Sequence, residues 1–432
     1  MWRTGSPTLL PMEAGRRARD PESHGFAERS RLRRHRRPLL VLAGLVVILA
    51  VEAIPGVPGH NQVSLAGELL TSDGSALASK IPLFHSASSN PCEMIESEFE
   101  AGNHLLKNSQ FGWYASIWPT YQALTSFEVR SLTDHHLGCG EDFETTLRAV
   151  DANYWDRAYP VPAFDQGPNP FHVRSDLPRV DDSLWMGLAL MSGYATTRNR
   201  SLLRRAESVF RLAVGNWDPL HGGIYWEDHL RGATIYDKAV VSNAPAAILG
   251  VELFVQTGAR EYLDWSERIV RWLHANLLDA RTGLYHDGID DHGRRPKLHP
   301  IELTYDEGAV LGAMAALSIV DPGAYPLSRA LRFAARCESF FARHHSYGHP
   351  AFDAIWAFNL LWVAGLAHER AFTEAALVSL RRAIAAEPRR SGDLLDRGSD
   401  LTLAALAALP ASDYLDLYPA MTRLSGTTAV SS

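Results

Sequence analysis

The feature that most constrains the fold of this 432-residue chain is an internal repeat with a period of 60 residues. The stretch YATTRNRSLLRRAESVF…HGGIYWED in residues 194–228 is similar to FVQTGAREYLDWSERIV…RTGLYHDG in residues 254–288. The matched pairs are Thr197/Thr257, Leu203/Leu263, Glu207/Glu267, Gly223/Gly283 and Tyr225/Tyr285. A third, looser copy begins with TYDEGAVLGAMAALSIV, residues 304–320. Such a chain is expected to fold as a series of similar units.

Each copy predicts a pair of helices. The first segment of copy one places Leu184, Leu188 and Met191 at helical spacing and is apolar nearly all round, which predicts a helix buried on more than one side. The second segment, residues 201–214, is half charged and predicts a surface helix with one apolar face. Strand alternation is scarce. We therefore predict that residues 91–424 form an all-α domain, an α/α toroid of five to six helical hairpins with the inner helices forming a barrel.

The N-terminal region differs from this domain in charge and hydropathy. Residues 1–38 contain ten arginines and four acidic residues, so this segment has a charge of +6. Because the net charge of the chain is −7, the remaining residues carry a charge of −13. An acidic body does not suit nucleic acid as a partner. The apolar run LLVLAGLVVILAV in residues 39–51 is shorter than the roughly 20 residues that span a bilayer, and it also suits the h-region of a signal peptide.

These features predict a domain organisation. We expect residues 1–37 to be a basic cytoplasmic segment and residues 38–57 a transmembrane signal-anchor, with a cleaved signal peptide as the alternative. A cytosolic protein with an apolar N-terminal segment is a third possibility. Residues 58–90 read as a linker and residues 425–432 as a disordered tail. Either of the first two alternatives puts the helical domain outside the cytoplasm.

Cysteine and histidine positions give weak indications. Cys92 and Cys139 could form a disulfide in an oxidising compartment, whereas the odd count and the absence of a CxxC motif do not indicate a zinc site. Two His-rich stretches, residues 134–139 and 344–349, are more typical of loops than of metal sites. We expect no metal and no cofactor.

Two neighbouring carboxylates, Asp181 and Asp182, precede the first inner helix of the repeat. Aspartates at the start of a helix commonly cap it or complement its dipole. The alternative is an acid/base pair, because the backbone at a helix entrance can bring two adjacent carboxyl groups to the separation of about 5 Å that retaining glycosidases use. Their proximity would keep one of them protonated near neutral pH.

Other polar and aromatic residues are predicted to lie on the same face of the toroid, where the inner helices begin. Each singly has a structural explanation in packing or capping, but their convergence favours a functional site. They are Trp185, Tyr225, Trp226, Lys238, Asn243, Asp287, Tyr305, Asp306 and Glu307. Glu227 and Asp228 are expected to add negative charge to the same region.

This combination resembles glycoside hydrolase family 76, the α-1,6-mannanases. The motifs that carry the resemblance are WPTYQAL (118–124), DDSLWMGLAL (181–190), GGIYW (222–226), SNAPAAILGVELFVQTG (242–258), TGLYHDG (282–288) and TYDEGAVLGA (304–313). The resemblance implies an (α/α)6 barrel and a retaining mechanism with Asp181 as nucleophile and Asp182 as general acid/base. Tyr225, Trp226 and Asp287 fall where the family contacts mannose. The departure is at Asp306 and Glu307, where the family usually has amides.

The resulting hypothesis is a membrane-anchored, extracytoplasmic endo-α-1,6-mannanase of the cell envelope, or a transglycosidase with the same site, with a mannan-type polysaccharide as partner. A sugar epimerase on the same toroid is disfavoured, because such enzymes use histidine pairs that project into the barrel and the histidines here fall in loops. A catalytically silent glycan-binding protein is the third alternative, which the altered DEG motif at 306–308 keeps open.

Overall fold

The computed structural model describes residues 91–109, 113–157, 161–168, 179–292, 296–344, 346–386 and 392–422. The basic segment, the membrane segment, the linker and the tail predicted from the sequence lie outside these residues.

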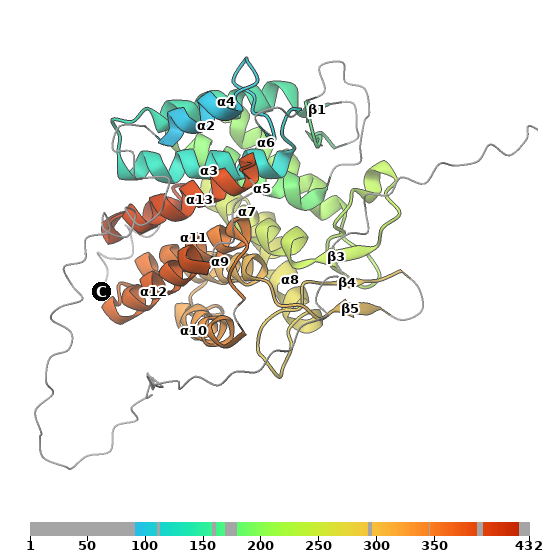
Figure 1. Ribbon diagram of the computed structural model, residues 1–432. Helices are drawn as coiled ribbons and strands as arrows, with labels where there is room; N and C mark the ends of the chain where they lie inside the picture. The colour runs from blue at the N-terminus through green and yellow to red at the C-terminus, as the bar shows by residue number, and fades with distance from the viewer. Residues whose placement is uncertain are drawn as a thin grey trace, which may run out of the picture. The chain divides into compact units, whose positions relative to one another are not determined.

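Six inner helices of the described chain form a closed ring. They are α3 (Ile117–Thr133), α5 (Val180–Thr197), α7 (Val240–Thr257), α9 (Thr304–Val320), α11 (Pro350–Ala367) and α13 (Leu394–Ala408). Each packs against the next in chain order, and α13 packs against α3, which closes the ring (Figure 1). The predicted (α/α)6 toroid is therefore confirmed.

The outer layer consists of helices that follow the inner ones in the chain. They are α4 (Cys139–Asn153), α6 (Arg200–Gly215), α8 (Arg260–Asn276), α10 (Leu327–His344) and α12 (Arg370–Ala386). Beside α13 and α3 the outer position is taken by α2 (Pro91–Phe99), and the 3-10 helix η3 (Ala411–Leu417), which follows α13, packs mainly against α11. The described repeat thus consists of inner–outer helical pairs, with an irregular last pair.

The helix boundaries follow from local sequence. The side chain of Asn199 accepts a hydrogen bond from the Ser201 backbone N–H and caps α6. Gly258 ends α7 with a φ of 74°, a left-handed conformation that glycine adopts without strain. The buried residues of α10 lie on one face, whereas those of α7 lie on all sides. This difference separates outer from inner helices, as the hydropathy pattern predicted.

Short strands cover the end of the barrel at which the inner helices begin. Strands β3 (Asp237–Ala239), β4 (Gly288–Asp290) and β5 (Lys297–His299) form an antiparallel sheet in the order β3-β4-β5. Strand β3 runs directly into α7. A two-residue hairpin, β1 (Trp155–Asp156) with β2 (Ala163–Phe164), and the 3-10 helix η2 (His229–Arg231) complete the elements. Strands of two or three residues are too short to produce a recognisable alternation in the sequence.

A disulfide joins Cys92 of α2 to Cys139 of α4, across 47 residues of sequence. The sequence left this pairing open. The bond holds the first described helix onto the first outer helix.

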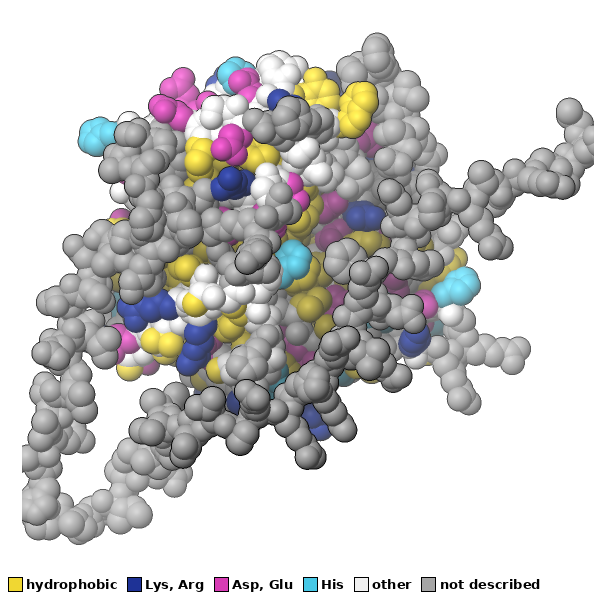
Figure 2. All heavy atoms as spheres, viewed as in Figure 1, with side chains coloured by type: hydrophobic (Ala, Val, Ile, Leu, Met, Phe, Trp, Pro, Cys, Tyr) yellow, Lys and Arg dark blue, Asp and Glu magenta, His cyan; other side chains and the backbone are white. Residues whose placement is uncertain are grey.

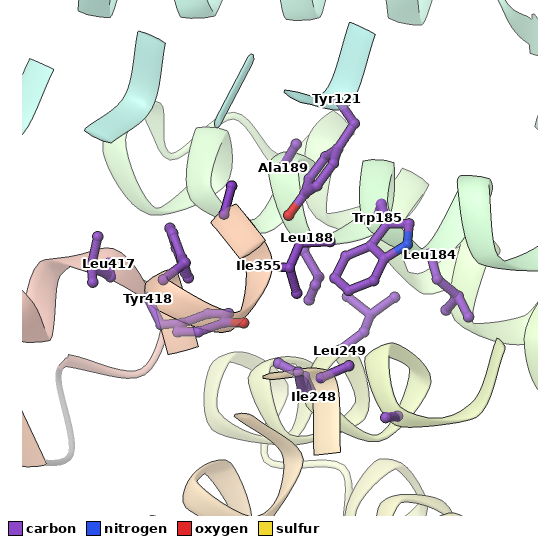
Figure 3. Close-up of a cluster of buried hydrophobic side chains, with 14 of the residues drawn as sticks. Tyr121, Leu184, Trp185, Leu188, Ala189, Ile248, Leu249, Ile355, Leu417 and Tyr418 are labelled. Atoms are coloured by element: carbon purple, nitrogen blue, oxygen red, sulfur yellow. The ribbon is translucent and has the colours of Figure 1, made fainter. Parts of the chain in front are cut away.

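Packed side chains fill the interior of the barrel. Tyr121, Trp185, Ile248 and Ile355 come from four inner helices and Tyr418 from the residue after η3, and they converge in its middle (Figure 3). The Tyr418 hydroxyl donates a hydrogen bond to Oδ1 of Asn359 at 3.0 Å. Buried polar side chains, among them Gln122, Asn359 and Thr402, lie in this interior beside the aromatic and aliphatic ones.

Two of the inner helices, α7 and α11, are long and apolar enough to cross a membrane by length and composition alone. In each, 78% of the apolar window is buried inside the protein, as expected for inner helices of a barrel.

Candidate active site

Asp181 and Asp182 lie in the first turn of α5, and the neighbouring loop fixes the start of that helix. The Val180 backbone N–H donates to the Trp226 carbonyl at 2.8 Å, and Arg179 forms an isolated antiparallel bridge with Glu227. Arg179 is the N-cap residue, so neither aspartate occupies the capping position. Both still lie where the helix dipole favours negative charge.

Burial dominates the electrostatics of the two aspartates. Burial and the nearby charge of Asp182 raise the pKa of Asp181 to about 8, although a hydrogen bond with the Trp226 side chain opposes the rise. Burial also raises the pKa of Asp182 to about 6, and there a hydrogen bond from Gln166 and the charge of Arg179 oppose it. The two groups titrate as a pair, and the pair holds one proton at neutral pH. Of the two residues, Asp181 keeps the proton more strongly.

One carboxylate oxygen of this pair has no neighbour to bond. Asp181 Oδ1 is buried and lacks a hydrogen-bond partner among the described residues. An unsatisfied buried oxygen is costly in a folded protein and is commonly explained by a functional role. The described residues therefore leave this oxygen of Asp181 without a hydrogen-bond donor.

The loop after α6 carries the two aromatic residues predicted for the site. Trp226 lies next to Asp181, and the Arg179 guanidinium stacks over its ring at 4.5 Å. Tyr225 stacks on His229 with ring centroids 4.0 Å apart and meets Tyr236 edge-to-face at 5.9 Å. The structure thus places Trp226 at the aspartate pair and Tyr225 in an adjacent aromatic cluster.

Lys238 lies in β3 and is bound on both sides by carboxylates. Its Nζ donates to Asp218 Oδ2 and to Asp291 Oδ2, each at 2.6 Å, and its side chain is 1% exposed. The ammonium group also lies over the Tyr225 ring at 5.0 Å. Lys238 therefore links the Tyr225 loop to the loop after β4.

Asn243 and Glu307 both hold the backbone of a loop that reaches the site. Asn243 Oδ1 accepts from the Ile224 N–H at 2.9 Å, and Glu307 Oε1 accepts from the Tyr285 N–H at 2.8 Å. Both side chains are fully buried. Burial raises the pKa of Glu307 well above its ordinary value.

Asp287, Tyr305 and Asp306 form a second polar group beside the aspartate pair. Tyr305 interacts electrostatically with Asp181 and is hydrogen-bonded to Asp287. Burial raises the pKa of Asp287, and the neighbouring His299 opposes this rise. Burial together with the charge of Asp287 raises the pKa of Asp306 well above its ordinary value. The start of α9 thus lies next to the start of α5, although the two are more than 100 residues apart in the chain.

Trp185 lies one turn deeper in α5 and is 2% exposed. Its ring centroid lies 5.5 Å from that of Tyr121 and 6.1 Å from that of Trp118. Trp185 and Tyr121 point into the barrel interior shown in Figure 3, and Trp118 packs against both rings.

The sequence analysis missed three residues that the structure brings to the site. Gln166 hydrogen-bonds Asp182, Arg179 lies between the helix and Trp226, and His299 lies 3.7 Å from both Asp237 Oδ1 and Asp287 Oδ2. Arg179 could have been found, because a base two positions before two adjacent acids is a local signal. Gln166 and His299 could not, because only the folded chain brings them near the acids.

One expectation about charge was wrong. Asp228 was predicted to add negative charge to the site, but its carboxylate is fully buried and pairs with Arg231 Nε at 3.0 Å. Its Oδ1 also accepts from the side chain of Asn216 and from the Leu230 N–H. Asp228 is buried because its carboxylate caps the start of η2.

Two described clusters have the geometry of metal ligands. Cys92, Cys139 and Asp142 form one, but both sulfurs are in the disulfide. Asp218, His221 and Asp291 form the other, where the Lys238 ammonium already binds both carboxylates. His135 and His136 are exposed, and His345 lies outside the described residues.

Comparison with protein-family models matches residues 166–353 to the model described as glycosyl hydrolase family 76. Among curated proteins, the mannan endo-1,6-alpha-mannosidase DCW1 of Eremothecium gossypii is 26% identical over 149 residues, which is 31% of this chain and 33% of that protein. Its counterpart in Saccharomyces cerevisiae is 28% identical over 149 residues, 32% of this chain and 33% of that protein. The match thus spans about a third of the length of these relatives.

Solved structures share the fold. A family 76 glycoside hydrolase from a bovine Bacteroides thetaiotaomicron strain has a TM-score of 0.65 and 16% identity, with 78% of each chain covered. An inactive variant of an α-1,6-mannanase from Salegentibacter, with two consecutive aspartates replaced by alanine and α-1,6-mannotetrose bound, has a TM-score of 0.63 and 17% identity. It covers 78% of this chain and 99% of that one.

Proposed function

We propose that this chain is a member of glycosyl hydrolase family 76, whose model matches residues 166–353, and that it is a retaining glycoside hydrolase that cleaves α-1,6-linked mannan. The observation that carries the proposal is the pair Asp181 and Asp182. Asp182 is buried and Asp181 half-buried, the pair shares one proton at neutral pH, and Asp181 Oδ1 has no hydrogen-bond partner among the described residues. Cleavage of a glycosidic bond requires one ionised and one protonated carboxyl group at the same place.

The proposed mechanism has two steps. An oxygen of Asp181 attacks the anomeric carbon while Asp182 gives its proton to the leaving glycosidic oxygen, which forms a mannosyl–Asp181 ester. Asp182 then takes a proton from a water molecule, and that water displaces Asp181 with net retention of configuration. If an acceptor sugar takes the place of the water, the same site performs transglycosylation.

The proton of the pair has to move for these roles. In the ligand-free protein Asp181 keeps the proton more strongly. Positive charge that develops at the anomeric carbon favours the ionised form of the facing carboxyl group, which in this proposal is Asp181. Bound substrate therefore shifts the proton to Asp182, where it is needed.

The remaining predicted site residues divide into two roles. We propose that Trp226, Asp287 and Tyr305 contact the sugar, because they adjoin Asp181 or each other. Tyr225 extends this surface, and Asp306, which is fully buried, supports it through its hydrogen bond with Asp287. Lys238, Asn243, Glu307 and Trp185 are buried and act through the loops and rings that they support.

We further propose that the mannan lies outside the cytoplasm, in the cell envelope, with the catalytic domain anchored by residues 38–57. The disulfide between Cys92 and Cys139 supports an oxidising compartment, since disulfides are rare in the cytosol.

The test is incubation of the protein and its Asp181→Asn and Asp182→Asn variants with linear α-1,6-mannan and with an aryl α-1,6-mannobioside. Both variants should lose at least about 10³-fold in mannan turnover, because each lacks one half of the acid/base pair. The Asp182→Asn variant should retain more activity on the aryl substrate, whose leaving group needs no protonation, whereas Asp181→Asn should not.

Retained mannan cleavage by either variant would contradict the proposed pair. The size and the anomeric form of the reaction products separate the alternatives. An α-anomeric first product supports retention, and products longer than the substrate indicate transfer. An epimer formed without bond cleavage would indicate an epimerase. Mannan binding without turnover by the unmodified protein would indicate a silent binding protein.

A further inference from the structure

A basic groove lies on the outer surface of the toroid, between α8 and α10. It consists of two adjacent cavities of about 500 Å³ and about 330 Å³ that share His274, Tyr285, Met314 and Arg329. Volumes of this size are typical of small-molecule sites. The groove is separate from the aspartate pair, since its lining comes from α8, α10, the Tyr285 loop, Met314 of α9 and the segment after α9, and includes no residue of α5.

The floor of the groove is mainly apolar. It is formed by Val270, Leu278, Tyr285, Met314, Tyr325, Pro326 and Phe333. Its neutral polar groups are few: the Tyr285 hydroxyl lies 3.4 Å from His274 Nδ1. A sugar or an inorganic ion would find few hydrogen-bond partners on such a floor, whereas a hydrocarbon chain would be well accommodated.

Cations line the rim. Arg329, Arg332 and Arg336 recur at spacings of three and four residues, so they lie on one face of α10. Arg271 and His274 face them from α8. Figure 2 shows Lys and Arg side chains over α10 and α12 beside hydrophobic ones.

The arginines on α10 have no charge partner within the described part of the chain. Arg271 pairs with Glu267 at 3.4 Å, but none of Arg329, Arg332 and Arg336 forms an ion pair with a described carboxylate. Like charges on one helix face repel each other and destabilise the helix. The chain as a whole is acidic, with a net charge of −7, so general basicity does not explain this cluster.

We propose that this groove binds an anionic phospholipid, with the phosphate on the arginines of α10 and the adjoining acyl portion on the apolar floor. Guanidinium groups match the geometry of phosphate oxygens and bind them through paired hydrogen bonds. The proposal needs both parts of the ligand, because the rim supplies charge and the floor supplies only apolar contact.

The experiment uses the full chain and a short-chain phosphatidylglycerol below its critical micelle concentration. Hydrogen exchange of the backbone amides in α8 and α10 reports binding at the groove itself, separately from binding to the basic segment at residues 1–37. We expect protection of both helices. Inorganic phosphate and short-chain phosphatidylcholine should bind at least about tenfold more weakly, which corresponds to about 1.4 kcal/mol.

The test variant is Arg329→Gln/Arg332→Gln, which leaves Arg336 in place because that side chain packs on Gly283. The matched control is Arg148→Gln/Arg343→Gln, which removes two exposed arginines that bond carbonyls of their own helices. We expect the affinity for phosphatidylglycerol to fall about tenfold in the test variant only, with mannan turnover unchanged in both. Equal affinity in the test variant, or equally tight binding of inorganic phosphate or phosphatidylcholine, would overturn the proposal.

Discussion

At the scale of single residues, the site depends on carboxyl groups that the fold keeps partly protonated. Asp181, Asp306 and Glu307 all have raised pKa values, and burial is the main cause in each case. An enzyme can use such a shift at one position to keep an acid protonated near neutral pH. At Asp306 and Glu307 the raised pKa makes the free energy of unfolding depend on pH.

The aspartate pair predicts a bell-shaped pH profile. The active form holds one proton, so activity is lost below about 6 as Asp182 becomes protonated and above about 8 as Asp181 loses its proton. We expect kcat/KM on α-1,6-mannan to be highest near pH 7. A profile that stays flat from pH 5 to 9 would show that the pair does not carry the reaction.

Glu307 predicts a pH-dependent stability. Its folded-state pKa is raised, so its protonated form stabilises the fold at low pH, and this contribution is lost as pH rises toward the folded-state value. A Glu307→Gln variant keeps an oxygen for the Tyr285 N–H and needs no proton. We expect its Tm to exceed that of the parent by a few degrees at pH 8, or roughly 1–2 kcal/mol, and by less at pH 5.

The measurement is thermal unfolding of both proteins at the two pH values. Glu307→Ala is the control, because it removes the acceptor and should lower Tm at both. An increase for Glu307→Gln that is equal at pH 5 and pH 8 would show that ionisation of Glu307 is not its cause.

At the scale of elements, the fourth residue of three inner helices holds the loop that precedes the helix. Asn243 in α7 accepts from Ile224 and Glu307 in α9 from Tyr285, while Asp353 in α11 accepts from the Gly348 N–H at 2.8 Å. The side chains differ, but each supplies an oxygen to a backbone N–H. This repeated contact fixes the loops that carry Tyr225, Trp226 and Asp287.

The contact made by Asn243 can be tested by substitution. An Asn243→Ala variant leaves the Ile224 N–H unsatisfied and loses the bonds to the Ile224 and Ala239 carbonyls. We expect a loss of about 2–3 kcal/mol in the free energy of unfolding, measured with denaturant, and a fall in kcat. Asn359→Ala is the matched control: Asn359 is equally buried in an inner helix but bonds Ile355 and Tyr418. It should reduce stability and leave kcat within about twofold; an equal loss of kcat in both would contradict a loop-holding role.

At the scale of the whole molecule, closure of the ring depends on close backbone contact between α13 and α3. A Cβ added at Gly398 would lie 2.9 Å from the Ala123 backbone N and 3.0 Å from the Gln122 backbone C. No side chain can move away to relieve that contact. Glycine at this position therefore lets the last inner helix meet the first.

A Gly398→Ala variant should lose about 1–3 kcal/mol in the free energy of unfolding, because the two backbones must move apart. Gly140→Ala in α4 is the matched control, since its added Cβ would meet only Ser131 Cβ at 3.6 Å. There alanine should be neutral or stabilise by up to about 1 kcal/mol through its higher helix propensity. Denaturant unfolding measures both. Equal stability changes in the two variants would show that ring closure does not require Gly398.

Particular positions show how much of the fold and of the candidate site the sequence predicted. The repeat predicted α5 to α10 as inner–outer pairs, because hydrophobic spacing reports directly on which face of a helix is buried. It also placed Asp181, Asp182 and Asp306 at the starts of inner helices. It could not predict the carboxylates bound to Lys238, because Asp218 and Asp291 lie 20 and 53 residues away.

The amino-acid sequence by itself determined the helical hairpins, their alternation of buried and exposed helices, and the position of two adjacent acids at a helix start. These properties depend on neighbours within a few turns. The tertiary structure alone decided which acids are protonated, which loops meet, and that α13 closes on α3. Burial and charge act through space, and ring closure brings together residues as distant as Gln122 and Ser399.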